Sequence, residues 1–189
     1  MNPDYSNYFW QGELVRLRPM QLEDAELNFL ASLDSPSRQV LQLGIELPSS
    51  LELQRKTMEK YAGCKEVDGV ILFAIETHAG EYAGGMSLHS MDEKNGTFSL
   101  GVVVHRAHWG HGYAADAVRM LLRYGFHERR FQKCNSACVA ENEASIRLHQ
   151  KLGFQEEGRR RRHLFYNGAY HDDVLFGLTR EEFDAQERN

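Results

Sequence analysis

Residues 97–114 read TFSLGVVVHRAHWGHGYA, and this stretch decides the fold. Its first half, Thr97 to Val104, is β-rich, and its last residues begin a segment whose apolar positions recur at helical spacing. Gly110 and Gly112 stand between strand and helix. Glycine lets a backbone approach a ligand closely, and free N–H groups at a helix start favour phosphate oxygens. The stretch therefore predicts either a site for a pyrophosphate-bearing ligand or a loop that needs glycine only for its turn.

Two further β-rich segments precede this strand, at residues 70–77 and 82–90. The sequences that join them, His78-Ala79-Gly80-Glu81 and Met91-Asp92-Glu93-Lys94-Asn95-Gly96, are typical of hairpin turns. We therefore expect a three-stranded antiparallel meander that leads directly into the glycine segment.

The rest of the chain alternates between helical and β patterns. The Ser-Pro-Ser and Leu-Pro-Ser sequences before residue 50 mark loops, and Ser49 or Ser50 would cap the helix that follows. Gly153 would end a later helix, and an Asn167-Gly168 turn would join the last two strands. The expected elements are a strand at 15–18, helices at 21–33, 51–61, 113–126 and 142–152, and strands at 135–140, 154–165 and 170–178.

This order of elements predicts an α/β (α+β) protein with one mixed, mostly antiparallel sheet of about seven strands flanked by about four helices. A chain of 189 residues, 42% of them hydrophobic, has the size and composition of one globular domain. We expect a single domain over residues 1–189, with an N-terminal extension at 1–12 and a C-terminal tail at 181–189.

Charge and cysteine content indicate which partners and which cellular compartment to expect for the protein. The 22 Lys and Arg residues against 27 Asp and Glu give a net charge of −5, which argues against nucleic acid as the main partner. No apolar run approaches the roughly 20 residues of a membrane helix. Cys64, Cys134 and Cys138 cannot all pair, which favours a reducing compartment. We expect a cytoplasmic protein that binds neither nucleic acid nor membrane.

Five short motifs follow one another along the chain: Leu17-Arg18-Pro19, Leu100-Gly101-Val102-Val103-Val104, Trp109-Gly110-His111-Gly112-Tyr113-Ala114, Asn142-x-x-Ser145 and Leu152-Gly153-Phe154. In this combination the chain resembles the GCN5-related N-acetyltransferases (GNAT), and within them the branch of the ribosomal-protein N-terminal and polyamine acetyltransferases. The resemblance covers about residues 13–180. It implies a GNAT-like sheet in which a splayed pair of strands forms a cleft for acetyl-CoA, and it suggests a homodimer.

The same resemblance implies roles for the residues of this stretch. Backbone groups of Val102 to Val104 would pair with the pantetheine arm of acetyl-CoA, and the N–H groups of His111 to Ala114 would hold its pyrophosphate. Trp109 stands where the superfamily usually has Arg or Gln, so the phosphate site would depend on backbone N–H groups, aided by Arg106, His108 or His111. The cofactor-binding residues expected on this basis are Val102, Val103, Val104, Trp109, Gly110, His111, Gly112, Tyr113, Ala114 and Asn142.

A dinucleotide site is the competing prediction for the same glycines. Gly110-x-Gly112-x-x-Ala115 matches the NAD(P) fingerprint, with Glu141 as the ribose-binding acid. Against it, the residues from His105 to Trp109 separate the strand from the first glycine, where a dinucleotide turn would be tight. Glu141 also lies well beyond the spacing of about twenty residues that the fingerprint requires.

The segment 142–152 carries the candidate chemistry. At about 100° per residue, Asn142, Ser145 and His149 share one helix face with aliphatic residues. Buried polar groups need partners, which either the backbone or a ligand could supply. By resemblance, Asn142 fits the pantetheine-binding Asn, His149 stands where many members carry a Tyr that protonates the CoA thiolate, and Ser145 fits a Ser with that role in the ribosomal branch. We expect His149 first, as the imidazolium, and Ser145 second, as the catalytic acid.

The sequence leaves the identity of the general base open. Direct attack on the acetyl group requires a neutral amine, and many relatives place a Glu where this chain has Ser99. Another acid, a water chain or an amine that is already neutral would have to replace it. Asp92, Glu93 and Glu141 are the candidate acids.

Three other features have both a functional and an ordinary interpretation. His105, His108 and His111 recur at metal-ligand spacing, but no nearby Cys or acidic residue completes a zinc set, so we expect no metal. The run Arg159–Arg162 is typical of a solvated edge strand; it could instead meet a CoA phosphate, an acidic substrate or a partner subunit. Asp172 and Asp173 face the substrate side in related proteins, where they would suit a cationic amine, or they are solvated surface groups.

These observations predict an acetyl-CoA-dependent N-acetyltransferase that moves an acetyl group directly to a primary amine. The acceptor would be a protein N-terminus or a small amine such as a polyamine. Because Ser99 replaces the usual Glu and His149 the usual Tyr, a non-catalytic acyl-CoA-binding sensor is the alternative. An NAD(P)-binding protein is the remote alternative.

Overall fold

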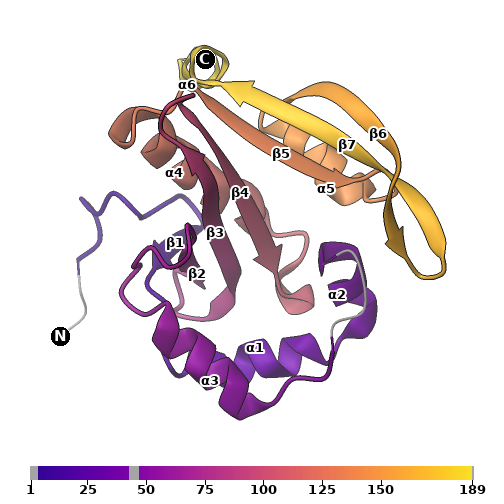
Figure 1. Ribbon diagram of the computed structural model, residues 1–189. Coiled ribbons are helices and arrows are strands. Elements are labelled where there is room, and N and C mark those ends of the chain that lie inside the picture. The colour runs from indigo at the N-terminus through magenta and orange to yellow at the C-terminus, as the bar shows by residue number, and fades with distance from the viewer. Residues whose placement is uncertain (1–3, 43–46, 189) are drawn as a thin grey trace.

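The computed structural model describes residues 4–42 and 47–188. Seven strands form one sheet in the order β1-β2-β3-β4-β5-β7-β6 (Figure 1). Every neighbouring pair is antiparallel except β4 with β5, which is parallel. The expected mixed, mostly antiparallel sheet is confirmed. The strands are β1 (Val15–Arg18), β2 (Ile71–Thr77), β3 (Tyr82–Asp92), β4 (Thr97–Val104), β5 (Lys133–Val139), β6 (Gln155–Tyr166) and β7 (Ala169–Thr179).

Six α-helices accompany the sheet in the described residues, two more than the sequence patterns predicted. In Figure 1, α1 and α3 lie together below β2 and β3, whereas α4 lies behind the strands and α5 behind β5 and β7. None of the helices in the described segments is long and apolar enough to cross a membrane. The helices are α1 (Asp24–Ser32), α2 (Ser35–Gln42), α3 (Leu51–Lys60), α4 (Tyr113–Arg123), α5 (Glu143–Lys151) and α6 (Arg180–Glu187), with short turns η1 (Arg106–His108) and η2 (Tyr124–Glu128).

The two faces of the sheet carry separate hydrophobic cores, because successive strand residues point to opposite faces. Phe73 and Ile75 of β2 belong to the larger core, together with Phe98 of β4 and Leu121 of α4. Ala74 points the other way and packs in a smaller cluster with residues of α1 and α3, such as Ala25 and Met58. The sheet is thus covered on both faces, and the two layers differ in what they contribute to the site.

The predicted loop around Ser-Pro-Ser was wrong, because residues 35–42 form α2. Proline is tolerated in the first turn of a helix, where its missing N–H costs no intrahelical bond. Asp34 supports this start: its side chain accepts a hydrogen bond from the Ser37 N–H, and its backbone carbonyl accepts one from the Arg38 N–H at 3.0 Å. The cap of α3 was anticipated correctly, since Ser50 Oγ accepts from the Leu53 N–H.

The end of the chain also differs from the prediction of a tail at 181–189. Residues 180–187 form α6, which begins with a reciprocal capping box between Thr179 and Glu182. Phe183 of this helix is 3% exposed and packs in the larger core, with its ring centroid 5.4 Å from that of Phe126. Five of the eight residues of α6 are charged, so the sequence did not reveal that Phe183 is buried and fixes the helix to the sheet.

Candidate active site

The central feature of the site is the divergence of the parallel strands β4 and β5. Their paired residues are Thr97 with Lys133, Phe98 with Cys134 and Ser99 with Asn135, and the pairing stops there. Beyond this vertex β4 continues to pair with β3, and β5 continues to pair with β7 (Figure 1). The edge of β4 from Leu100 to Val104 that faces β5 therefore has no strand partner among the described residues, as the family resemblance implied.

A cavity of about 450 Å³ occupies this divergence. On one side it is lined by residues of β5 and α5, including Ser136, Cys138 and Asn142. It passes between the strands and reaches the other face of the sheet, where Asn28 of α1 and Thr57 of α3 line it. Val102 and Val103 lie along its wall, and Val104 lines an adjoining cavity of about 270 Å³. The cleft thus connects the two layers of helices.

The glycine segment follows β4 and the short turn η1, and it starts α4. Gly112 is the N-cap residue, with a φ of 82° and no side chain to cap the helix. The N–H groups of the first helical turn, beginning at Tyr113, have no intrahelical acceptors and carry the positive end of the helix dipole. A Cβ added at Gly110 would meet no atom within 4 Å, so the approach to these N–H groups is open. This geometry suits an anionic group.

The side chains around this helix start have separate structural roles. The Trp109 indole N–H donates to the Val104 carbonyl at 2.7 Å and so closes the turn after β4. Arg106 pairs with Asp34, its Nε lying 2.5 Å from Oδ2, and it also lies over the Trp109 ring. His111 stacks on Tyr113 with centroids 5.3 Å apart. Arg106 is thus engaged by Asp34, which lies directly before α2.

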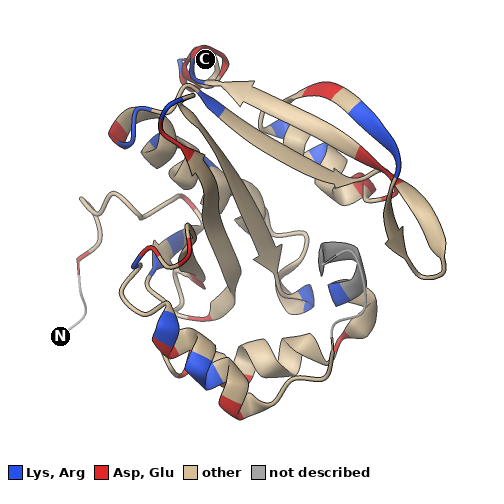
Figure 2. Cartoon of the chain, in the orientation of Figure 1, with Lys and Arg blue, Asp and Glu red and all other residues tan. Residues whose placement is uncertain are grey.

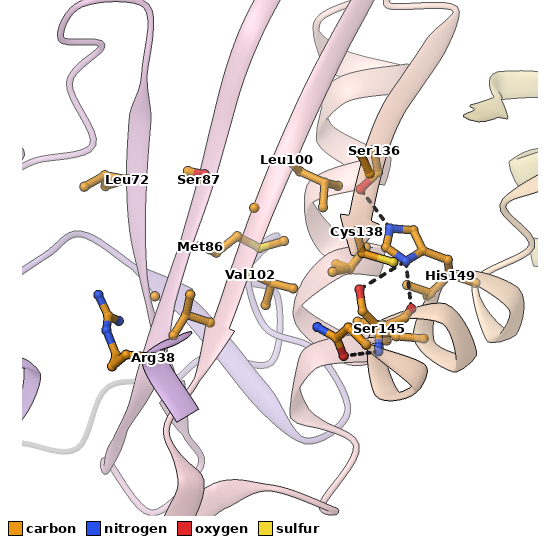
Figure 3. A pocket seen from close by; sticks show the side chains of 18 of the residues that line it. Arg38, Leu72, Met86, Ser87, Leu100, Val102, Ser136, Cys138, Ser145 and His149 are labelled. Atoms are coloured by element: carbon orange, nitrogen blue, oxygen red, sulfur yellow. Dashed lines mark hydrogen bonds between the residues drawn. The ribbon is translucent and has the colours of Figure 1, made fainter. Parts of the chain in front are cut away.

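On α5, the three polar residues singled out by spacing do lie together, but they bond mainly to one another and to the backbone. The Asn142 side chain caps the helix by accepting from the Ser145 N–H at 3.0 Å. His149 Nδ1 lies 2.7 Å from the Ser145 carbonyl, and Nε2 lies 2.8 Å from Ser136 Oγ on β5 (Figure 3). The Ser145 hydroxyl is 3.4 Å from His149 Nδ1.

The environment of His149 favours the neutral form of its ring over the imidazolium expected from the sequence. The residue is 7% exposed, and its ring is stacked on Phe176 at 4.4 Å with Phe154 against its edge. Burial lowers the pKa of His149 below its ordinary value, and the hydrogen bond to the Ser145 backbone opposes this shift only in part. This shift favours the neutral imidazole, and both ring nitrogens have hydrogen-bond partners.

The three acids considered as general bases lie elsewhere. Asp92 accepts from the Asn95 N–H in the β3–β4 turn, Glu93 pairs with Arg129, and Glu141 pairs with His171. Of the described residues that line the cavity, none is one of these three.

Sequence reasoning missed two residues near the vertex. Ser136 lies on β5 between Cys134 and Cys138, and the period-two pattern of a strand was the signal that could have found it. His89 lies directly across from Ser99 in the β3–β4 register. Burial lowers the pKa of His89, and its Nδ1 is buried without a hydrogen-bond partner among the described atoms.

The arginine run and the acidic pair form a charged ladder on the outer hairpin, away from the cleft lining. Arg160 pairs with the buried Asp173 across β6 and β7, and Asp172 accepts from the Arg162 N–H. Figure 2 shows the basic residues along the outer strand of the sheet. Across the segments that the structure covers, no three His, Cys, Asp or Glu side chains are grouped as a metal site.

Comparison with known proteins agrees with this arrangement. A family model described as "Acetyltransferase (GNAT) domain" matches residues 15–155. The chain belongs to the GNAT acetyltransferase family. It is therefore an enzyme of the N-acetyltransferase class, whose general reaction is acetyl transfer to amines, with acetyl-CoA as the donor that the family uses.

Several GNAT relatives match over nearly the whole chain. The "SPbeta prophage-derived uncharacterized N-acetyltransferase YokL" of Bacillus subtilis is 35% identical, over 93% of this chain and 96% of its own. The "Putative ribosomal N-acetyltransferase YdaF" of the same organism is 29% identical, over 92% and 96%. The spermidine N(1)-acetyltransferase of Escherichia coli is 25% identical, over 92% and 90%.

Solved GNAT structures show the same fold. A GNAT-family acetyltransferase from Bacillus anthracis superposes with a TM-score of 0.77 at 22% identity, covering 91% of this chain and 98% of its own. The spermidine N-acetyltransferase of Vibrio cholerae, in complex with CoA and spermine, also gives 0.77 at 18% identity, covering 89% and 97%.

The residues of this GNAT chain fit acetyl-CoA on their own geometry. The helix start at Gly112 offers backbone N–H groups for a pyrophosphate, and the unpaired edge of β4 offers a strand-like partner to an amide-bearing arm. At 3.3–3.4 Å per residue, Val104 to Leu100 spans about 13 Å. An arm that starts at the helix and follows this edge therefore ends at the vertex, beside Ser136.

Proposed function

We propose that this protein transfers an acetyl group directly from acetyl-CoA to the primary amine of a protein N-terminus. The observation that carries the proposal is the cavity of about 450 Å³ that passes through the sheet at the β4–β5 vertex. It joins the face of α4 and α5, where the donor would lie, to the face of α1 and α3. A direct transfer needs this connection, because donor and acceptor must meet in one site without a covalent enzyme intermediate.

On the donor side, we assign the pyrophosphate to the N–H groups at the start of α4 and the pantetheine arm to the edge of Val102 to Val104. Trp109 supports this edge through its bond to the Val104 carbonyl. Asn142 projects from the start of α5 and lines the cavity while it caps the helix, so its amide N–H₂ is the group available to a ligand carbonyl.

On the acceptor side, apolar and uncharged polar side chains prevail. Met20, Met58 and Leu72 provide apolar surface, and Thr57 and Ser87 provide hydroxyl groups. Such a lining suits an amine with an apolar group next to it, as in the first residue of a protein. The name of the relative YdaF, a ribosomal N-acetyltransferase, favours the same acceptor class, whereas the spermidine acetyltransferases among the relatives favour a small amine.

Ligand-dependent thermal stabilisation is the first test. A ligand at 100 times its Kd adds about 2.7 kcal/mol to the free energy of unfolding. We expect acetyl-CoA and CoA to raise the Tm, and NAD and NADP to leave it unchanged. Stabilisation by NAD or NADP alone would refute the donor assignment in favour of a dinucleotide site.

An acceptor panel with free-thiol detection is the second test. We expect CoA release with short peptides whose first residue is Ala, Ser or Met, and less with the same peptides blocked at the N-terminus. If spermidine is acetylated faster than the peptides, the acceptor is a small amine and not a protein N-terminus. Binding of acetyl-CoA without thiol release across the whole panel would favour the sensor interpretation.

The cellular setting proposed is the cytoplasm, because the three cysteines are unpaired in the structure and a reducing compartment keeps them so. The homodimer suggested by the family resemblance stays a prediction, which light scattering of the purified protein would test.

A further inference from the structure

Ser136 occupies a distinctive place in the cleft. It is the residue that directly follows the last paired position of β5, Asn135, so it lies at the vertex where β4 and β5 separate. It lines the cavity and is only partly buried. Its side chain points toward His149, as Figure 3 shows, and its hydroxyl oxygen lies 2.8 Å from Nε2 of that residue. A reacting group at the inner end of the cleft would therefore meet the Ser136 hydroxyl first.

The directions of the hydrogen bonds around His149 follow from the chemistry of their partners. A carbonyl oxygen can only accept, so the 2.7 Å contact of Nδ1 with the Ser145 carbonyl requires the proton to be on Nδ1. In a neutral imidazole, Nε2 is then an acceptor, and the Ser136 hydroxyl donates to it. Ser136 Oγ still has lone pairs with which to accept a hydrogen bond, and the residue lines the cavity.

The ring of His149 is held so that this arrangement persists. Phe176 stacks on it with an interplanar angle of 8°, and Phe154 meets it edge-on. The Cys138 thiol on β5 lies beside the His149 ring (Figure 3), and burial is the main cause that raises the pKa of this thiol. A base that is oriented by a third group and bonded to a hydroxyl is the arrangement that moves protons in many enzymes.

We propose that Ser136 and His149 form a proton relay that serves both halves of the acetyl transfer, a role that rests on the proposed function. As the amine nitrogen bonds to the acetyl carbon, Ser136 Oγ accepts the proton that the nitrogen loses and passes its own proton to His149 Nε2. As the carbon–sulfur bond breaks, Ser136 gives a proton to the thiolate and takes back the proton from Nε2.

The relay moves one proton in total, from the amine to the CoA sulfur. The amine loses one hydrogen, the CoA sulfur gains one, and Ser136 and His149 return to their starting states. The acceptor enters this step as the neutral amine that direct attack requires, and the pair supplies the thiolate protonation for which His149 stands in place of the family's Tyr. The contact of Nδ1 with the Ser145 carbonyl leaves Nε2 as the accepting nitrogen, and burial, which lowers the pKa of His149, favours the same neutral form.

The experiment compares Ser136→Ala and Ser136→Thr with a control away from the cavity, Ser32→Ala, in the full chain. Ser32 Oγ bonds to the Phe29 carbonyl on α1, and Ser32 is outside the cavity lining. We expect Ser136→Ala to lower kcat about 100-fold and to leave the Kd for acetyl-CoA within about twofold. Ser136→Thr keeps the hydroxyl and should recover most of kcat, and Ser32→Ala should match the wild type.

A second readout does not depend on activity. Nitrogen NMR of the free protein at pH 7 should show His149 neutral, with its proton on Nδ1. Ser136→Ala should shift the Nε2 resonance, because the hydrogen bond from the hydroxyl is lost, while Ser32→Ala should leave it unchanged. A charged His149 at pH 7 would overturn the relay.

The outcomes separate the relay from the proposed function. A wild type that binds acetyl-CoA but acetylates no amine refutes the proposed function and the relay with it. An active wild type whose kcat survives Ser136→Ala refutes the relay alone. Mass spectrometry after mixing with acetyl-CoA completes the test: an acetyl group on Ser136 would make this residue a nucleophile and would also overturn the relay.

Discussion

The carboxylate of Asp116 on α4 accepts a hydrogen bond from the Leu14 backbone N–H at 2.8 Å, and this contact joins two segments that are 102 residues apart. The same carboxylate also accepts from the N–H groups of Glu13 and Val15. Gly12 is confined beside it, because a Cβ there would lie 2.4 Å from Asp116 Oδ2. One buried acid thus fastens the start of β1 to the helix that bears the glycine segment.

Asp116→Ala should lower the free energy of unfolding by about 3 kcal/mol, because it leaves three N–H groups in a half-buried site without their charged acceptor. Chemical denaturation measures the change. Asp184→Ala is the matched control, since Asp184 forms a surface pair with His127 and its loss should cost about 0.5 kcal/mol. Equal effects of the two substitutions would contradict the anchoring role.

Asn142 has a capping role and a ligand-binding role that two substitutions separate. Asn142→Ala removes the cap of α5 and should cost about 1 kcal/mol of stability. Asn142→Asp keeps an oxygen for the Ser145 N–H but loses the amide donor. We expect it to preserve the Tm of the free protein and to weaken acetyl-CoA binding, as measured by calorimetry. Unchanged binding in Asn142→Asp would remove Asn142 from the pantetheine site.

Gly101 lies in the wall between the donor and acceptor sides, and a Cβ there would lie 2.8 Å from Ser87 Oγ. Gly101→Ala should raise the KM for the amine about tenfold by narrowing the acceptor side, with little change in the Kd for acetyl-CoA. Steady-state kinetics with a varied acceptor tests this. Adding Ser87→Ala removes the blocking atom and should restore the KM. A double variant as impaired as the single one would refute the steric cause.

Stability should depend on pH through His105. Burial, with a further contribution from the charge of His108, lowers the pKa of His105 from 6.5 to about 4. Between these values the unfolded chain binds more protons than the folded one, so the free energy of unfolding falls as the pH falls from 6.5 toward 4 and is retained above 6.5.

The measurement is urea unfolding at pH 7.5, 6 and 5. His105→Gln should show a shallower loss of stability with acid than the wild type, and His163→Gln, on the exposed strand β6, should keep the wild-type slope. The same slope in all three proteins would show that His105 does not carry the dependence.

The local patterns predicted most of the fold because they are short-range effects. The alternation in β2, β3 and β4 and the turns between them were visible in the chain, and Gly112 marked the start of α4. The missed helices show the limit of this reasoning. Residues 35–42 carry a proline that is compatible with both loop and helix, and α6 depends on the burial of Phe183, which only the sheet can provide.

For the site, the sequence by itself determined which residues share a helix face and which glycines free the start of α4, because helical and strand periodicity operate within one element. It also carried the family motifs that predict the reaction. Only the tertiary structure decided what those residues do. Burial beside Phe154 and Phe176 lowers the pKa of His149, and β5 places Ser136 against its Nε2. Solvent exclusion and contacts between distant segments set these properties, and neither is encoded in local spacing.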